Sequence, residues 1–220
     1  MELQIDYPVC SVTPGTNSHE VLIGGGGGRG NYGVPNHIAY GEIDSSGKLT
    51  ITKKEKYDDI VRCLTTSFCN NRYYISFING SDIIVLCKQD RTNPLKTISL
   101  TPEATKNASS EANTDDEKYF TSLSTLSNLL VCTDEKSKLY IYNFPKLIEI
   151  CSSPENSFKK AKLIKSINNN ILILCISKSK VKLLKPTKKL RVVAESEYFN
   201  YDLKDVLAIE NDIYLLMVKE

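Results

Sequence analysis

The stretch Ile171-Leu172-Ile173-Leu174-Cys175 is an unbroken apolar run in a chain of 220 residues. Turn-forming residues lie on both sides of it, Asn168-Asn169-Asn170 before and Ser177 after. An apolar run of this length between turn signals predicts a strand that is buried on both faces. Four similar runs occur elsewhere in the chain: Val21-Leu22-Ile23, Tyr73-Tyr74-Ile75-Ser76-Phe77, Leu129-Leu130-Val131-Cys132 and Ile213-Tyr214-Leu215-Leu216.

The spacing of these runs indicates a repeat. The last three begin about 42 residues apart, and the first two intervals are longer by about ten to fifteen residues. A four-stranded blade of the WD type takes about 40–45 residues. Each run is therefore predicted to be the second strand of a blade, although the Gly-His and Trp-Asp signatures of WD repeats are missing.

Further short apolar segments flank each run, and almost none of them shows the 3.6-residue period of a helix. The pattern predicts strands in groups of four, with a final pair. The expected strands are 7–13, 19–24, 37–44, 48–54, 60–68, 72–78, 82–88, 95–100, 119–125, 128–133, 138–143, 147–151, 160–166, 170–176, 180–185, 190–197, 203–209 and 212–218.

The predicted fold is all-β, a β-propeller of four-stranded blades in one domain over 1–220. The blades are expected at about 7–54, 60–100, 119–151, 160–197 and 203–220, so that four are complete and the fifth is a half. A propeller has to close, because an open end leaves a sheet edge unpaired. A shortened form, further blades outside this sequence and a compact five-bladed ring are all compatible with the pattern.

Two polar segments interrupt the strand pattern. The stretch 102–118 contains no residue that needs burial, which predicts a disordered surface loop. The basic stretch 178–191 places Lys178, Lys180 and Lys182 on one strand face. We expect that face to be solvated, with an anionic membrane surface or a nucleic acid as alternative contacts.

The composition excludes several classes of function. Charge is nearly balanced, with 28 basic and 26 acidic residues, whereas a nucleic-acid binder usually carries a basic excess. The seven cysteines form no C-x-x-C pair and are expected to be small buried hydrophobes in a reducing compartment. The two histidines, His19 and His37, have no metal-ligand spacing to other residues. No nucleophile or carboxylate set for enzymatic catalysis is evident, and Asp58-Asp59 is expected in a turn.

The beginning of the chain lacks the apolar segment of a secretory signal. No run of about 18 apolar residues suggests a membrane helix. We therefore expect a cytosolic location.

The most informative stretch is Gly24-Gly25-Gly26-Gly27-Gly28-Arg29-Gly30-Asn31-Tyr32-Gly33-Val34-Pro35-Asn36. Ordering so many glycines costs backbone entropy, so a particular conformation is expected to require them. Gly25-x-Gly27-x-x-Gly30 matches the dinucleotide-binding fingerprint, but that site needs a helix directly afterwards. Gly33 and Pro35 occupy the place of that helix. A Walker loop is excluded because no Lys-Ser/Thr follows Gly30. A flexible glycine hairpin remains the simplest alternative.

Gly25-Gly26-Gly27-Gly28, four residues, then Gly33-Val34-Pro35-Asn36 resembles the first-blade loop of the Sec-twelve-like exchange factors, called prolactin regulatory element-binding proteins in animals. Tyr7-Pro8 in the preceding strand agrees with that context. The resemblance covers residues 7–44 closely and the remainder only in architecture. In that family a seven-bladed propeller faces the cytosol and a C-terminal helix tethers it to the endoplasmic reticulum.

The resemblance implies a guanine-nucleotide exchange factor for a Sar-type small GTPase, which starts COPII coat assembly at the endoplasmic reticulum without covalent chemistry. It implies a structural potassium ion at Gly25, Gly26, Gly27, Gly28 and Gly30. Asn31, Gly33, Val34, Pro35 and Asn36 are implied as the active part of the loop.

Within this loop, the side chains of Val34 and Pro35 would form an apolar tip, and Asn31 and Asn36 would brace the loop or touch the partner. The chain departs from the family in its length, its blade count and its lack of a membrane helix. The other hypothesis is a non-catalytic propeller scaffold.

Overall fold

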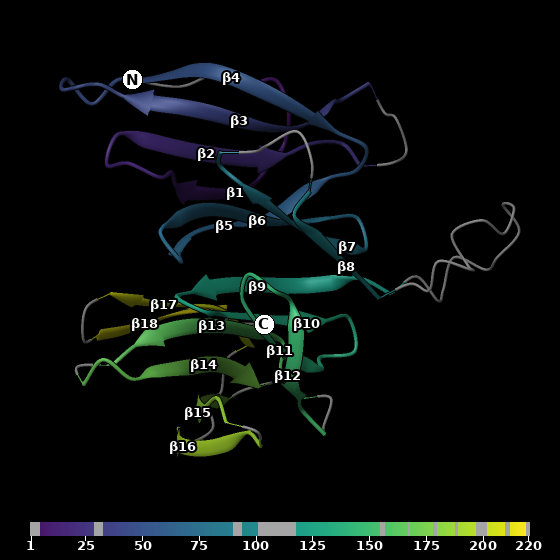
Figure 1. The fold of residues 1–220 in the computed structure, drawn as a ribbon, viewed down its shortest axis with the longest axis vertical. Helices are drawn as coiled ribbons and strands as arrows, with labels where there is room; N and C mark the ends of the chain where they lie inside the picture. The colour runs from purple at the N-terminus through teal and green to yellow at the C-terminus, as the bar shows by residue number, and fades with distance from the viewer. Residues whose placement is uncertain are drawn as a thin grey trace, which may run out of the picture. The chain divides into compact units, whose positions relative to one another are not determined.

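The computed structural model describes residues 5–28, 33–89, 94–100, 118–154, 157–166, 168–177, 180–187, 189–196, 202–209 and 212–218 (Figure 1). In these residues the chain forms eighteen strands in five antiparallel sheets and no helix. No helix in this part of the chain is long and apolar enough to span a membrane. The segment 101–117, which makes up most of the predicted polar loop, lies outside the described residues, as do Lys178 and Lys188 of the basic stretch.

The chain divides into two compact units, residues 1–119 and 120–220. Unit 1 holds two four-stranded sheets. Their strands are β1 (Val9–Pro14), β2 (Glu20–Gly25), β3 (Asn36–Ile43) and β4 (Leu49–Tyr57), then β5 (Val61–Cys69), β6 (Arg72–Asn79), β7 (Asp82–Cys87) and β8 (Lys96–Ser99).

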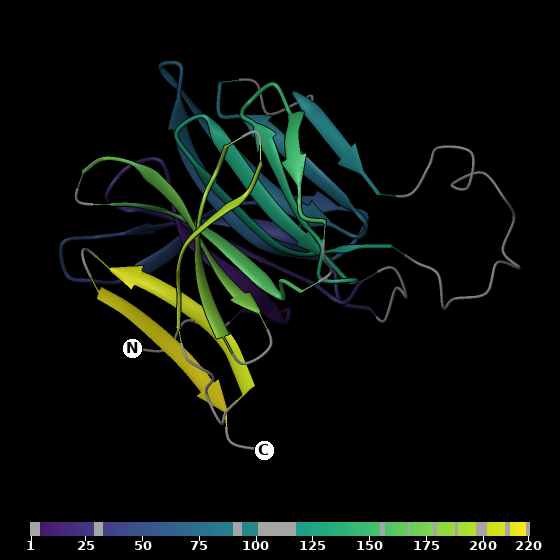
Figure 2. The same cartoon turned by 90° about the horizontal axis from the view of Figure 1, so that it is seen from below.

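Unit 2 holds two four-stranded sheets and a two-stranded one. Their strands are β9 (Phe120–Leu126), β10 (Leu129–Asp134), β11 (Leu139–Asn143) and β12 (Ile148–Ser152), then β13 (Lys160–Lys165), β14 (Ile171–Ser177), β15 (Lys180–Lys185) and β16 (Arg191–Glu195), and finally β17 (Asp202–Ile209) and β18 (Asp212–Val218). The last pair is the yellow hairpin of Figure 2. All eighteen expected strands are present within a few residues of their predicted bounds.

In each of the four-stranded sheets, consecutive strands are hydrogen-bonded neighbours, so every sheet is a simple meander. This order is the strand order of a propeller blade. The second strand of each four-stranded blade contains an unbroken run of at least four buried residues, as the apolar runs predict. Every side chain of β10 is buried, and so are those at positions 173–177 of β14. The outermost strand β16 is exposed along its whole length.

Within each unit, apolar side chains of adjacent blades form a common core. In unit 1, Leu22 and Ile38 of the first blade pack with Ile75 and Phe77 of the second. In unit 2, Val131 and Ile141 pack in one cluster with Ile173 and Cys175. Side chains of Leu174 and Ile176 pack in turn against Leu203 of β17. Face-to-face packing of this kind is what a stack of blades requires.

A serine on the first strand of a blade repeatedly fixes the first strand of the next blade. The Ser11 hydroxyl accepts a hydrogen bond from the backbone N–H of Leu64 at 2.9 Å. In unit 2 the Ser122 hydroxyl accepts from Ala161 N–H at 3.2 Å, and Ser124 accepts from Leu163 N–H at 3.1 Å. These bonds satisfy strand-edge amides that no sheet partner reaches.

The seven cysteines are free. Cys69, Cys87, Cys132 and Cys175 are buried, as expected for small hydrophobes. The expectation of burial is wrong for Cys10, which is exposed, and only partly right for Cys63 and Cys151. Cys10 lies on β1, a sheet-edge strand whose outward positions are open.

Candidate functional site

The glycine-rich stretch connects β2 to β3 at one end of the first blade. Gly25 ends β2 and pairs with Val9 of β1 and His37 of β3. Gly26–Gly28 and Gly33–Pro35 continue from the two strands as irregular backbone. Gly30 and Asn31, which the resemblance assigns to the ion and to the partner, lie outside the described residues.

Gly25 and Gly26 cannot carry a side chain because it would collide with neighbouring atoms, and Gly27 lies in tight contact with the facing loop segment. A Cβ on Gly25 would overlap the carbonyl oxygen of Pro8. One on Gly26 would lie 2.6 Å from the Cα of Asn36, and Gly26 also has φ +141°. One on Gly27 would lie 3.0 Å from the Cβ of Val34. The two arms of the loop therefore approach each other more closely than chains with side chains allow.

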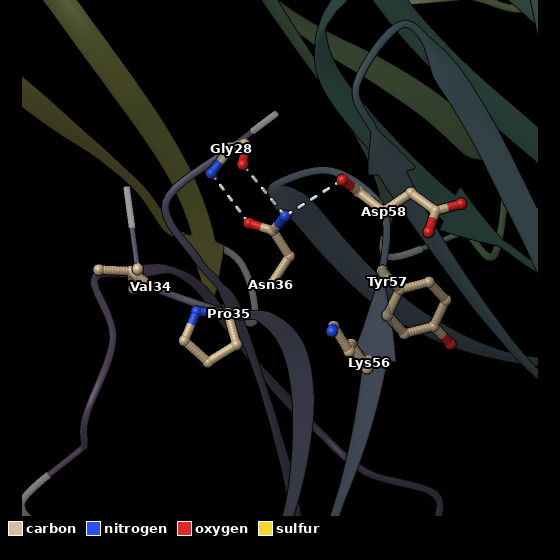
Figure 3. A pocket seen from close by; sticks show the side chains of 8 residues that line it. Gly28, Val34, Pro35, Asn36, Lys56, Tyr57 and Asp58 are labelled. Carbon is tan, nitrogen blue, oxygen red and sulfur yellow. Dashed lines mark hydrogen bonds between the residues drawn. The ribbon is translucent and has the colours of Figure 1, made fainter. Parts of the chain in front are cut away.

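Asn36 closes the base of the loop (Figure 3). Its side-chain oxygen accepts a hydrogen bond from Gly28 N–H at 2.9 Å, and its amide nitrogen donates to Gly28 O at 3.3 Å. The same nitrogen donates to the carbonyl oxygen of Asp58 at 3.3 Å. Asn36 is only 6% exposed, so its bonds are largely shielded from water. The asparagine thus ties both arms of the loop to the connection between the first two blades.

That connection, Asp58–Ile60, is itself held by the next blade. The Asn79 amide nitrogen donates to the carbonyl oxygen of Asp59 at 2.6 Å. The Asp59 carboxylate accepts from Ile60 N–H at 2.7 Å. Asn36 and Asn79, from consecutive blades, therefore bind the carbonyls of the consecutive residues Asp58 and Asp59. We call this set of hydrogen bonds, which fixes the base of the loop, the frame.

A hollow of about 600 Å³ opens beside this frame. Figure 3 shows Val34, Pro35 and Asn36 on the loop side, and Lys56, Tyr57 and Asp58 at the end of β4 on the other. Nothing in the sequence suggests Lys56 or Tyr57 as site residues. Lys56 lies across from His37 in the β3–β4 pairing, a register that residue types alone do not reveal.

Val34 and Pro35 are half-buried. The side chain of Val34 packs on the cluster of Tyr7, Ile23 and Ala39. Val34 therefore contributes to the packing of the loop base as well as to the wall of the hollow. Gly33 is exposed, and a Cβ added to it would meet nothing within 4 Å. Its φ of +77° is the reason that this position needs glycine.

His37 lies beside the loop in a setting that disfavours its charged form. Burial lowers the pKa of its imidazole below the usual 6.5, and the positive charge of Lys54 lowers it further. The ring centroid is 5.8 Å from that of Tyr7, and Nδ1 is buried without a hydrogen-bond partner. His19, the other histidine, lies in the turn before β2.

Oxygen atoms are the ligands that the loop base offers. The carbonyl oxygens of Gly28 and Asp58 both lie 3.3 Å from the Asn36 amide nitrogen, and the Asn36 side-chain oxygen is close by. Hard monovalent and divalent cations prefer oxygen donors. No group of three His, Cys, Asp or Glu side chains that could hold a transition metal occurs in the described part of the chain. Oxygen is also the donor type that potassium prefers, but these three oxygens already take part in the hydrogen bonds of Asn36.

Comparisons with known proteins bear on the fold. No protein-family model matches the chain, and no curated protein does. Among 460 matching solved chains is BBS1N, crystallised in complex with ARL6DN. The match has a TM-score of 0.65 at 9% sequence identity and covers 94% of this chain and 60% of BBS1N. The chain thus spans three fifths of the length of that structure.

At this identity the likeness shows the fold alone. BBS1N is a β-propeller, and the meander sheets described above superpose on it. The match gives no support to the Sec-twelve-like family in particular. The chain has an all-β, propeller-type fold of four-stranded blades.

Proposed function

We propose that this chain binds a small GTPase through the loop 25–36 and promotes the release of its bound GDP, acting as an exchange factor for a Sar-type GTPase. The observation that carries the proposal is the clamped base of the loop. Asn36 joins Gly28 on one arm to the Asp58 carbonyl on the blade connection, so the described base of the loop is fixed to the first blade.

A fixed base matters because exchange is achieved by binding alone. A factor that binds the nucleotide-free GTPase more tightly than the nucleotide-bound form shifts the population toward release. The free energy available for this shift is reduced by every degree of freedom that has to be frozen on binding. A loop that is already ordered at its base before binding loses less of this free energy. No proton transfer or covalent intermediate is needed.

A potassium ion is proposed to complete the loop. As the resemblance implies, backbone oxygens of the glycine run, of which the structure describes Gly25, Gly26, Gly27 and Gly28, would hold it. When bound, the ion would supply positive charge that offsets the negative ends of these backbone dipoles. Gly25, Gly26 and Gly27 would contribute by leaving that space free of side chains.

The likeness to BBS1N favours the same class of partner. That propeller was crystallised with ARL6DN, a small GTPase. With 9% identity the likeness itself shows the fold alone, so a small GTPase as the partner of this chain is part of the proposal. The place of action that goes with a Sar-type partner is the cytosolic face of the endoplasmic reticulum, at the start of COPII coat assembly.

Release of fluorescent mant-GDP from a purified Sar-type GTPase tests the proposal. The wild-type chain should accelerate release in potassium buffer, and the double variant Val34→Ala, Pro35→Ala should lose most of the acceleration. Because Val34 also packs on the core, thermal unfolding of the variant has to be compared with the wild type. A wild-type chain that leaves the intrinsic release rate unchanged contradicts the proposal.

The second candidate function is a non-catalytic scaffold that binds a small GTPase without promoting the release of its GDP. The BBS1N complex favours it, since that complex demonstrates binding. Pull-down with GDP-loaded and nucleotide-free GTPase separates the two functions. An exchange factor retains the nucleotide-free form preferentially, and a scaffold does not.

A further inference from the structure

Arg62, at the start of β5, is a charged side chain without a counter-ion among the residues that the structure describes. Its Nη2 donates a hydrogen bond to the carbonyl oxygen of Gly80 at 3.1 Å. Its guanidinium carbon lies 5.4 Å from the ring centre of Tyr119. Its Nε is buried without an acceptor. One carbonyl and one aromatic face thus hold the guanidinium in place without neutralising it.

We propose that Arg62 is the receptor for a carboxylate of the protein partner that engages the glycine loop. A guanidinium presents five N–H donors in a planar fork, and only one of its nitrogens has an acceptor among the described residues. A partly buried arginine without an anion retains its desolvation cost. A carboxylate that approaches the Nη donors that Gly80 leaves free offsets that cost through charge-assisted hydrogen bonds.

The position of Arg62 links it to the loop by a continuous set of hydrogen bonds. Asn36 binds the Asp58 carbonyl. The next carbonyl, of Asp59, binds Asn79. Gly80, the residue after Asn79, accepts the bond from Arg62. Loop base and arginine are therefore fixed to one frame at one end of unit 1.

The strand pairing agrees with this placement. Gly24 lies so close to β5 that an added Cβ would be 2.8 Å from Cγ1 of Val61, the neighbour of Arg62. After Arg62 the β5–β6 pairing is interrupted by a register shift, and Cys63 has φ 50°. A bulge of this kind re-aims the side chains beside it. A partner seated on the loop would thus find a preoriented cation at the neighbouring blade.

A carboxylate is the anion that the surroundings fit best. Tyr119, whose ring contacts the arginine, is 39% exposed. Near the loop, Val9 is 46% exposed and lies on β1 opposite Gly25. Apolar side chains around a central charged pair are characteristic of protein–protein contacts, where the surrounding contacts exclude water from the pair. This inference rests on the proposed function, because it assigns a second contact to the same partner.

The test measures the affinity of the nucleotide-free Sar-type GTPase for the full chain by biolayer interferometry. Arg62→Gln removes the charge, and Arg62→Lys keeps the charge but loses the fork. Arg72→Gln is the matched control, because Arg72 is an exposed arginine at the far end of the same β5–β6 hairpin. Thermal unfolding of each variant establishes that the second blade is intact.

We expect Arg62→Gln to weaken binding about tenfold or more and to flatten its dependence on ionic strength, because one screened ion pair is lost. Arg62→Lys should fall between wild type and Arg62→Gln, and Arg72→Gln should bind like wild type. If wild type and Arg62→Gln bind equally well, the carboxylate receptor is wrong and the proposed function stands. If the wild-type chain does not bind the GTPase at all, both are wrong.

Discussion

Asn36 connects more of the candidate site than any other single residue. Replacing it by alanine leaves Gly28 N–H and the carbonyls of Gly28 and Asp58 without their partner. Buried polar groups without partners cost about 1–3 kcal/mol, so Asn36→Ala should lower the free energy of unfolding by about that amount and also reduce nucleotide exchange.

Urea denaturation measures the first effect and mant-GDP release the second. Asn17→Ala serves as the control. Asn17 also accepts bonds from two backbone amides, His19 N–H and Glu20 N–H, but it lies in an exposed turn. Its removal should cost less stability and leave exchange intact. Equal effects of the two variants on exchange would contradict the bracing role of Asn36.

His37 is expected to make stability depend on pH in a window just below neutrality. Its pKa is lowered in the folded chain, first by burial and then by Lys54, so the unfolded imidazole takes up a proton at higher pH than the folded one. Stability is therefore fully present above about pH 6.5 and falls as pH drops below it.

The variant His37→Phe retains a ring beside Tyr7 and removes the titration. The free energy of unfolding, measured at intervals from about pH 7.5 to 5.5, should decline in the wild type and stay flatter in the variant. Lowered carboxyl pKa values, such as that of Glu20, act only below about pH 4.5. If the free energy of unfolding depends on pH in the same way in wild type and in His37→Phe, His37 is not the titrating group.

At the scale of the element, each glycine of the first blade should tolerate an added methyl group according to which atoms that group would contact. A Cβ on Gly25 meets backbone, the Pro8 carbonyl, whereas a Cβ on Gly47 has nothing within 4 Å. Gly25→Ala should therefore destabilise the chain by several times as much as Gly47→Ala, which costs only the strain of its φ of +80°, about 1 kcal/mol. Urea midpoints of the two variants provide the comparison, and a smaller loss for Gly25→Ala would contradict the close approach of β1 and β2.

The strands could be predicted from sequence because each blade repeats one simple pattern, an apolar second strand between half-buried neighbours. In β14 the run Ile171–Cys175 is half-buried at its first two positions and fully buried at the other three. The glycine-rich loop could be predicted because so many consecutive glycines indicate a backbone conformation that other residues do not adopt. What Asn36 binds was not predictable, since Gly28 and Asp58 are brought together only by the packing of the first blade against its connection.

Arg62 gave no signal in the sequence, for a different physical reason. Its orientation depends on a bulge after it, on the turn at Gly80 and on the ring of Tyr119. These three features are far apart in the chain. Composition and hydrophobic periodicity indicate which residues are buried. They do not indicate which half-buried charged side chain lacks an ion pair in the folded chain.

For the whole molecule, the packed blades predict how the cysteines react. Cys69, Cys87, Cys132 and Cys175 are buried in the native chain, and Cys10 is exposed. Burial raises the pKa of the Cys175 thiol, which suppresses its thiolate further. When the native chain is treated with a thiol reagent, Cys10 should react first and Cys63 and Cys151 more slowly. The four buried thiols should react only after denaturation. Mass spectrometry of the labelled peptides identifies them. Rapid modification of all seven would contradict the packed blades.

The central claim is that the segment 25–36 is the surface that engages a small GTPase. Hydrogen–deuterium exchange of the chain alone and in complex with the nucleotide-free GTPase tests it most directly, because the backbone amides of Gly26–Val34 report contact without any substitution. The account predicts slower exchange of these amides in the complex, together with the start of β5. Unchanged exchange across 25–36, with protection at some other face of the chain, would contradict it.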